Sequence, residues 1–275
     1  MTQKLNQDDS GAALNSDDIT ERGLEWNRVP AAIWRARRGI LRPVTRLDPV
    51  RFSDLLGVDR QVAALRHNTE RFLRGLPANN VLLWGARGTG KSSLIKALLN
   101  EYVTEGLRII EVDKNDLLDL NDIIDDIRDE SHRFVIYCDD LSFDAGESQY
   151  KALKSALEGS IELPPDNVLV YATSNRRHLL PEYMSDNDNS KVVDGELHHG
   201  EAVEEKISLS DRFGLWLSFY PISQDEYLNI VDHLFPAVQE RSALHRAALK
   251  FAYTKGVRSG RAAKQFYRAY SGEFN

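Results

Sequence analysis

The sequence Gly-Ala-Arg-Gly-Thr-Gly-Lys-Ser at residues 85–92 constrains the fold of this 275-residue chain more than any other feature. It matches the pattern G-x-x-x-x-G-K-[ST] at every defined position, and this pattern is informative only between a strand and a helix. An apolar run at 81–84 precedes it and a helix-like run at 93–99 follows it. The context therefore predicts a phosphate-binding loop in an α/β fold.

The residue types of this loop explain how it would bind a polyphosphate. Glycines can adopt positive φ, which lets backbone N–H groups approach phosphates closely, and the following helix directs its positive end to the same place. We expect Lys91 to reach the β- and γ-phosphates and Ser92 to ligate Mg²⁺. The residues predicted to lie at the phosphates are Gly85, Ala86, Arg87, Gly88, Thr89, Gly90, Lys91, Ser92 and Ser93.

Composition excludes several classes of protein. Charged residues make up 28 % and hydrophobic residues 42 %, as is usual for a globular protein. The single cysteine, Cys138, excludes an internal disulfide framework and fits a reducing compartment. No stretch is apolar enough to span a membrane, and the N-terminus lacks the pattern of a secretion signal. We therefore expect a cytoplasmic protein with no membrane partner.

Charge is distributed unevenly along the chain. Residues 111–130 hold nine acidic and two basic residues, whereas residues 241–268 hold eight Lys or Arg and no acid. A net charge of −7 argues against a protein whose whole surface binds nucleic acid, but it does not exclude a local basic patch. The acidic block is most simply a solvated helix face.

The sequence divides into four regions. Residues 1–25 are polar and predict a disordered tail. Residues 26–51 carry Trp26 and Trp34 among several arginines, and we interpret them as a helical arm that packs on the core. A basic surface for a neighbouring subunit or for nucleic acid is the alternative. Residues 52–221 form the predicted nucleotide-binding domain, and residues 222–275 a small helical domain.

An alternation of strand-like and helix-like runs predicts the fold class. Helical periodicity appears at 117–127 and 149–158. The pattern indicates a three-layer α/β core with a five-stranded parallel sheet covered on both faces. In the last region, Ser223 and Glu226 form a predicted capping box. The predicted strands are 81–84, 107–112, 134–138, 168–172 and 215–219.

The polar segment 184–210 interrupts the alternation and is expected to be a long loop or hairpin. His198 and His199 are adjacent in it, which is poor spacing for metal ligands, so we predict no metal site there.

Two carboxylates follow the predicted strand 134–138. At this position Asp139 is expected to hold the Mg²⁺ shell beside the phosphate loop, and Asp140 to orient the attacking water as general base. An acidic strand-to-loop turn is the simpler alternative. Asn175, after the next strand, is the first candidate for a polar group near the γ-phosphate, and Thr173 is the second.

The order of these motifs resembles the AAA+ superfamily of ATPases. Residues 54–187 are similar to a family of uncharacterised bacterial AAA+ ATPases, and the resemblance as a whole covers about 50–270. Asn175 matches sensor 1, and Arg212, within 209–213, matches the segment that carries the arginine finger. Arg261, or Arg258, matches sensor 2 of the helical lid. Gly57 and Val58 lie in a segment, 52–59, that resembles the one cupping adenine.

The resemblance implies that ATP and Mg²⁺ are the cofactors and that the protein is an ATPase. It implies a ring-type homo-oligomer, in which Arg212 reaches the nucleotide of the neighbouring subunit; a surface ion pair with Asp211 is the alternative. We expect nucleotide state to be coupled to remodelling of a protein partner. A nucleic-acid-associated ATPase of initiator or loader type, and a slowly hydrolysing ATP-gated switch, are the other interpretations.

Two departures from the family pattern bear on these expectations. Asp140 stands where most AAA+ members have Glu, so hydrolysis is expected to be slower. Residues 113–116 lack the aromatic-apolar-Gly loop of protein-threading unfoldases. The second departure makes a substrate unfoldase less favoured.

Overall fold

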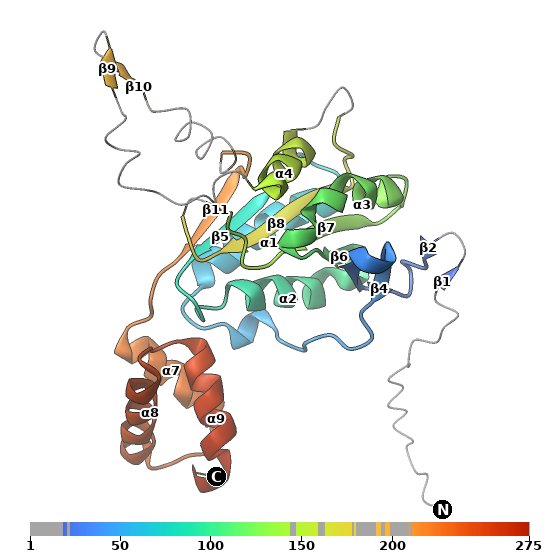
Figure 1. The fold of residues 1–275 in the computed structure, drawn as a ribbon. Helices are drawn as coiled ribbons and strands as arrows, with labels where there is room; N and C mark the ends of the chain where they lie inside the picture. Colours follow the sequence, from blue (N-terminus) through green and yellow to red (C-terminus); the bar gives the residue numbers. More distant parts are fainter. Residues whose placement is uncertain are drawn as a thin grey trace, which may run out of the picture.

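The computed structural model describes residues 19–20, 23–143, 147–158, 163–177, 179, 191–193, 196–198, 209 and 211–274. Figure 1 shows a twisted sheet with helices on both faces and a separate group of helices beside it. The predicted tail over 1–25 lies mostly outside the described residues, as does most of 184–210. Within 184–210, β9 (Lys191–Val193) and β10 (Glu196–His198) pair antiparallel as a hairpin.

The central sheet contains all five predicted strands, and these five are parallel to one another. It has seven strands in total, so the predicted count of five is wrong. Their order across the sheet is β11 (Leu215–Phe219), β5 (Val81–Gly85), β8 (Val168–Ser174), β7 (Arg133–Cys138), β6 (Leu107–Glu111), β3 (Ala31–Arg35) and β4 (Ile40–Pro43).

The two additional strands come from residues 26–51, and the predicted helical arm is wrong. β3 pairs parallel with β6, and β4 pairs antiparallel with β3. Alanine and arginine favour helices in isolation, but the open edge of β6 offers a ladder of hydrogen bonds that overrides this weak preference. Trp34 is buried, as predicted for its side chain, and its Nε1–H donates to Asp119 Oδ2 at 2.8 Å.

Side chains alternate between the two faces of the sheet, and each face has its own layer of helices. Leu83 packs with α1 (Asp59–Leu73) and α2 (Lys91–Tyr102), whereas Leu82 packs with α3 (Leu120–Ile127) and α4 (Ser148–Glu158). Both leucines are fully buried, as expected for a parallel sheet covered on both sides. The three-layer architecture follows from these contacts.

Short segments connect these elements. The 3₁₀ segments are η2 (Ala36–Arg38), η3 (Phe52–Asp54), η4 (Val103–Glu105) and η5 (Lys114–Asp119). Near the start of the chain, β1 (Ile19–Thr20) pairs with β2 (Gly23–Leu24).

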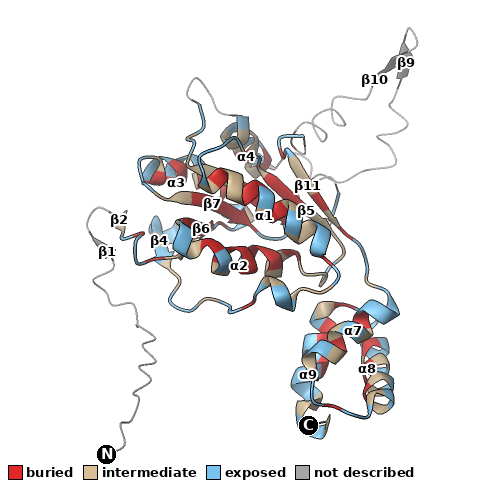
Figure 2. Ribbon diagram, turned by 180° about the vertical axis from the view of Figure 1, so that it is seen from behind, coloured by how far each residue is buried: buried red, intermediate tan, exposed pale blue. Residues whose placement is uncertain are grey.

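The last three helices form a separate hydrophobic cluster, centred on the fully buried Phe235 and Phe266. They are α7 (Gln224–Leu234), α8 (Arg241–Lys255) and α9 (Gly260–Phe274). Figure 2 shows their buried faces turned toward one another. The capping box predicted at Ser223 and Glu226 is confirmed, with both hydrogen bonds present.

Candidate functional site

The carboxyl ends of β5, β8 and β7 lie next to one another at one end of the sheet. β5 lies between β11 and β8, so the loop after β5 leaves the sheet next to the ends of β8 and β7. In open α/β sheets, ligands bind outside these carboxyl ends, where neighbouring connections diverge. The topology therefore brings the glycine-rich loop, the two acidic residues and Asn175 to the same region.

Two glycines of the loop combine a positive φ with a close neighbouring atom. Gly85 has φ 129°, and a Cβ there would collide with the carbonyl oxygen of Phe219 on β11. Gly88 has φ 75°, and a Cβ there would lie 2.9 Å from Ser259 Oγ. The loop is thus in close contact with β11 on one side and with the start of α9 on the other.

Lys91, the first residue of α2, lies inside the curve of this loop and is 7 % exposed. Its Nζ donates to the carbonyl oxygens of Gly85 and Ala86, both at 2.8 Å, and to Asn175 Oδ1 at 3.2 Å. Burial lowers the pKa of Lys91; Asp140 and Asp139 oppose this effect, and Arg87 and Arg261 add to it. The ammonium group is therefore held at the centre of the site.

Asp139, directly after β7, accepts three hydrogen bonds on its Oδ1 atom. The donors are Thr173 Oγ1 at 2.5 Å, Tyr137 Oη at 2.8 Å and Ser92 Oγ at 2.8 Å. Burial alone would raise the pKa of Asp139, but these hydrogen bonds outweigh burial, and the pKa lies below its ordinary value. Asp139 is thus held as a carboxylate next to Ser92.

Asp140 has φ 50°, the only positive φ of a non-glycine residue in the described part of the chain. Aspartate tolerates this left-handed conformation better than most residues. Its N–H donates to Thr173 Oγ1 at 2.9 Å, and its carboxylate accepts a hydrogen bond from the Asn175 side-chain amide. Asn175 therefore joins Lys91 to Asp140.

A cavity of about 840 Å³ opens over these groups. Its lining includes Arg87 through Ser93, Asp139, Asp140 and Asn175. Of the segment predicted to surround adenine, Val58 lines the cavity and Gly57 does not. Gly85 and Ala86 do not line it either, and they take part through the carbonyl groups that bind Lys91.

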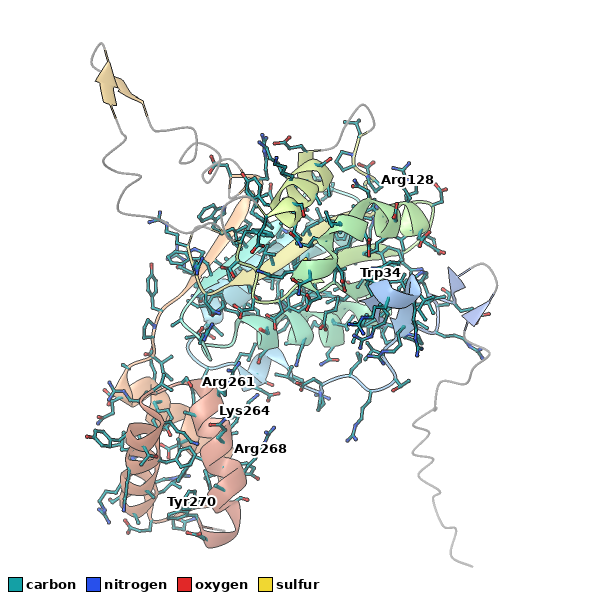
Figure 3. The ribbon with its side chains drawn as sticks, viewed as in Figure 1. Trp34, Arg128, Arg261, Lys264, Arg268 and Tyr270 are labelled. Carbon is teal, nitrogen blue, oxygen red and sulfur yellow. The ribbon has the colours of Figure 1, made fainter. Side chains whose placement is uncertain are left out.

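The helical region contributes one wall of this cavity. Arg261, Lys264 and Arg268 of α9 line it, and their spacing of three and four residues places them on one face of the helix. Figure 3 labels these side chains on the same side of α9. Ser259 caps α9 by accepting from the Ala262 N–H at 3.1 Å, and it also lies against the loop at Gly88. Of the two sensor 2 candidates, Arg261 lines the cavity and Arg258 does not.

Arg212 lies away from this cavity. Its guanidinium forms an ion pair of 2.6 Å with Glu158 at the end of α4, and its side chain is 45 % exposed. The alternative expected from the sequence was an ion pair with Asp211, and the partner in the structure is instead Glu158. The predicted role of Arg212 at a neighbouring subunit stays a prediction.

Three residues at the site were not singled out in the sequence. Tyr137 precedes Asp139 by two residues, and the two-residue period of a strand gave a usable signal that both face the same way. Lys264 and Arg268 lie within the basic block at 241–268, but they can be assigned to the cavity only once α9 is placed against the core. Thr173, the second candidate for sensor 1, contacts both acidic residues.

The oxygen ligands at the site suit Mg²⁺. Ser92 and Asp139 offer a hydroxyl and a carboxylate 2.8 Å apart, and Mg²⁺ is commonly bound by one or two such groups together with water and substrate phosphates. Among the described residues, no three His, Cys, Asp or Glu side chains gather as a metal cluster. None of the described helices combines the length and apolarity needed to cross a bilayer.

The motifs predicted from the sequence lie together at one end of the sheet. The phosphate loop follows β5, Asp139 follows β7 and Asn175 follows β8, all at one end of the sheet.

Solved structures with a similar fold include RuvB of Thermotoga maritima, described as a Holliday junction branch migration motor. It is 14 % identical, with 80 % of this chain and 72 % of that chain covered and a TM-score of 0.47. Two substituted forms of the same protein are 15 % identical, with the same coverage and TM-scores of 0.47 and 0.48. A comparison with curated proteins found no match. The family model described as "Protein of unknown function (DUF815)" matches residues 27–274, and the chain therefore belongs to the DUF815 family.

Proposed function

We propose that this protein is an AAA+ ATPase that binds Mg·ATP in the cavity between the phosphate loop and α9 and hydrolyses it to ADP and phosphate. The observation that carries the proposal is the joining of Lys91 to Asp140 through Asn175, beside the contact between Ser92 and Asp139. These groups combine a phosphate-binding cation, a metal-binding pair and a candidate general base within one network.

The size and lining of the cavity suit a nucleoside triphosphate. A volume of about 840 Å³ lies within the range of roughly 300–1,000 Å³ usual for small-molecule sites. Arg87, Lys91 and Arg261 supply positive charge for the phosphates. An apolar end for the base comes from Leu55, Leu56, Val58, Ile222 and Ile230.

Ser92 and Asp139 are the residues proposed to hold Mg²⁺. When bound, the ion would neutralise charge on the β- and γ-phosphate oxygens. Because the Asp139 carboxylate already accepts hydrogen bonds from Thr173 and Tyr137, it is oriented before any metal arrives. Such outer partners commonly fix the direction of a ligating group.

The remaining residues position the reactants. Asp140 is proposed to accept a proton from the attacking water, and the amide of Asn175 holds its carboxylate in place. Lys91 would exchange its bonds to the Gly85 and Ala86 carbonyls for phosphate oxygens. The rate would arise from orientation of the water and stabilisation of charge on the transferred phosphoryl group.

Arg261 and Arg212 are proposed to act from outside the core. Arg261 would contact the phosphates from the helical domain, which would then serve as a lid over the nucleotide. Arg212 would reach the γ-phosphate bound by a neighbouring subunit, which requires a ring-type homo-oligomer. Its 45 % exposed side chain is accessible to such a neighbour, at the expense of the ion pair with Glu158.

Nucleotide state is proposed to drive remodelling of a protein partner. A slowly hydrolysing switch is the second candidate, and the position of Asp140 favours it. This carboxylate is one methylene shorter than the usual Glu and is held by Asn175.

Steady-state ATP turnover of the wild type and of Asp140→Asn tests the proposal. Asparagine tolerates positive φ, so the backbone at this position is retained. We expect the variant to bind ATP like the wild type but to turn it over about 10²–10⁴ times more slowly. If the wild type binds ATP tightly and does not turn it over, the switch is the correct function; absence of ATP binding would rule out both.

A further inference from the structure

A segment remote from the nucleotide cavity carries an unusual set of charges. Residues 26–47 contain six arginines and no lysine, aspartate or glutamate. We propose that the arginine hairpin, defined as residues 31–46 with β3, η2 and β4, binds the sugar-phosphate backbone of nucleic acid through Arg37, Arg38, Arg42 and Arg46. This inference goes beyond ATP hydrolysis.

Apolar contacts hold the arginine hairpin in place. Trp34 is 7 % exposed and packs in the core cluster that contains Ile123 of α3, with Leu41 of β4 against it. Trp34 also donates to Asp119, and β3 is paired along the edge of β6. The fold of the hairpin is therefore fixed mainly by contacts that do not involve the guanidinium groups of its arginines.

The four arginines make no ion pair with any carboxylate in the described part of the chain. All four are exposed, and the hydrogen bond that involves one of their side chains runs from Arg42 to the carbonyl of Pro43 at 3.4 Å. Four like charges on one hairpin repel one another, which destabilises the fold slightly. Because they do not stabilise the structure, a role in binding an anion accounts for them better.

The pleat of the sheet directs Arg42 away from the face that is covered by α3 of the acidic block at 111–130. Trp34 and Leu41 are directly opposite each other and point toward the face covered by α3. Arg42 pairs with Ile33 and alternates with Leu41, so it points to the other face. Arg35 is not counted in the surface because its charge acts on Asp116 in the acidic block.

The arginine hairpin leads toward the basic face of α9. After β4, the chain runs beneath α2 toward the helical region (Figure 1). On this path Asp48 binds Lys96 at 3.2 Å, and Lys264 of α9 is close enough to lower the pKa of Asp48. Burial raises the pKa of Asp48. The charges of Lys96 and Lys264 and the hydrogen bond from the Val50 N–H lower it by more, so the pKa lies below its ordinary value. Lys264 and Arg268 face this side in Figure 3, so a long anion can continue from the hairpin toward the cavity.

The choice of arginine favours phosphate as the anion. The planar guanidinium donates two parallel hydrogen bonds to phosphate oxygens, which a lysine cannot do. Protein interfaces are also enriched in arginine, but they combine it with aromatic and other apolar residues at their centre. The largest exposed apolar side chain on the hairpin is Ile40, at 42 % exposure, and its tryptophan is buried. A second copy of this chain, offering its acidic α3, is the other occupant to be tested.

Fluorescence anisotropy with labelled single-stranded and duplex DNA and RNA of mixed sequence, over a series of salt concentrations, tests the proposal. The variant is Arg38→Gln with Arg42→Gln. The matched control is Arg60→Gln with Arg74→Gln, which removes the same charge from an exposed position on α1 and from its exposed C-cap residue. None of these four residues lines the cavity, so ATP binding and the thermal midpoint should be unchanged in both proteins and serve as folding controls.

We expect the wild type to bind at low salt with little dependence on sequence. The hairpin variant should bind at least about tenfold more weakly, and its plot of log K against log salt should lose about 1.4–1.8 units of slope, corresponding to two phosphate contacts. The control should bind like the wild type.

Absence of binding by the wild type would overturn the proposal, and so would equal losses in the variant and the control. If the hairpin variant changed the mass in sedimentation without changing nucleic-acid binding, the surface would belong to an interface between copies of this chain. ATP hydrolysis enters none of these readouts, so the two proposals can fail separately.

Discussion

Thr173 on β8 and Asp139 at the end of β7 are joined by a hydrogen bond of 2.5 Å, donated by the Thr173 hydroxyl. The same hydroxyl oxygen accepts the backbone N–H of Asp140 at 2.9 Å. One buried side chain on a neighbouring strand thus orients both acidic residues of the site. Their geometry depends on the pairing of β7 with β8.

Replacing Thr173 by valine tests this arrangement, because valine has a similar volume and no hydroxyl. Asp139 would lose one of its three donors, and the Asp140 N–H would lose its acceptor. We expect a higher Mg²⁺ requirement for ATP binding and turnover reduced about 10–100-fold, the range for outer partners of a metal site. Thr173→Ser keeps the hydroxyl and should resemble the wild type; the role assigned to Thr173 would be wrong if both substitutions behaved alike in a Mg²⁺ titration.

The same substitution should change how stability depends on pH. The pKa of Asp139 is lower in the folded protein than its ordinary value, so its carboxylate stabilises the fold above the unfolded pKa, near 4. That contribution disappears as the pH falls through the folded pKa. Thr173→Val should therefore lower the free energy of unfolding by about 1.5–3 kcal/mol at pH 7, and by less near pH 3. Urea unfolding at both values measures this, and a difference that grew toward acid would contradict the assignment.

Gly88 offers a test of the contact between the phosphate loop and α9. An alanine there takes a strained φ, which costs about 1–2 kcal/mol, and its Cβ meets Ser259. Gly256 has a similar φ of 67° with no atom within 4 Å of the added Cβ, so Gly256→Ala supplies the strain without the collision. We expect both variants to lose similar stability in thermal unfolding but only Gly88→Ala to lose ATP affinity, by about tenfold or more. Equal ATP affinities of Gly88→Ala and Gly256→Ala would show that the contact between the loop and Ser259 does not shape the site.

Arg212 has two possible roles that a pair of variants separates. If its function is the ion pair with Glu158, then Glu158→Gln and Arg212→Ala should have the same small effect, within about 1 kcal/mol of stability. If Arg212 completes a neighbouring site, only Arg212→Ala should abolish turnover. Mixing it with Lys91→Ala subunits should then restore part of the activity, because each supplies what the other lacks. Absence of any rescue in a mixed oligomer would count against action in trans.

The sequence predicted the strands that position the site better than it predicted β3 and β4, which lie at one side of the sheet. The runs that become β5, β7 and β8 are apolar on both faces of the sheet, as strands covered by helices must be. Gly85 ends β5, Asp139 follows β7 and Asn175 follows β8. The segment Ala31–Arg35 has no such signal, because its alanines and its arginine equally suit a helix. Its pairing with β6 is a tertiary contact between segments far apart in the sequence.

The residues of the candidate site also fall into two groups: those that local motifs predict, and those that reach the site only through tertiary contacts. Lys91, Ser92 and Asp139 follow from local motifs, since their roles depend on the loop and strand that carry them. Lys264 has no motif of its own and reaches the cavity only because Ser259, at the start of α9, lies against the loop at Gly88. The left-handed conformation of Asp140 also follows from tertiary structure, in which Thr173 holds its N–H and Asn175 its carboxylate.

Isothermal titration calorimetry of ATP with Mg²⁺ tests the central claim most directly. The wild type and Lys151→Ala, which removes an exposed lysine from α4, should bind ATP with the same heat and affinity. Lys91→Ala, with its fold verified by circular dichroism, should give no binding heat. Binding of ATP to Lys91→Ala with the affinity of the wild type would contradict the placement of the nucleotide at this loop.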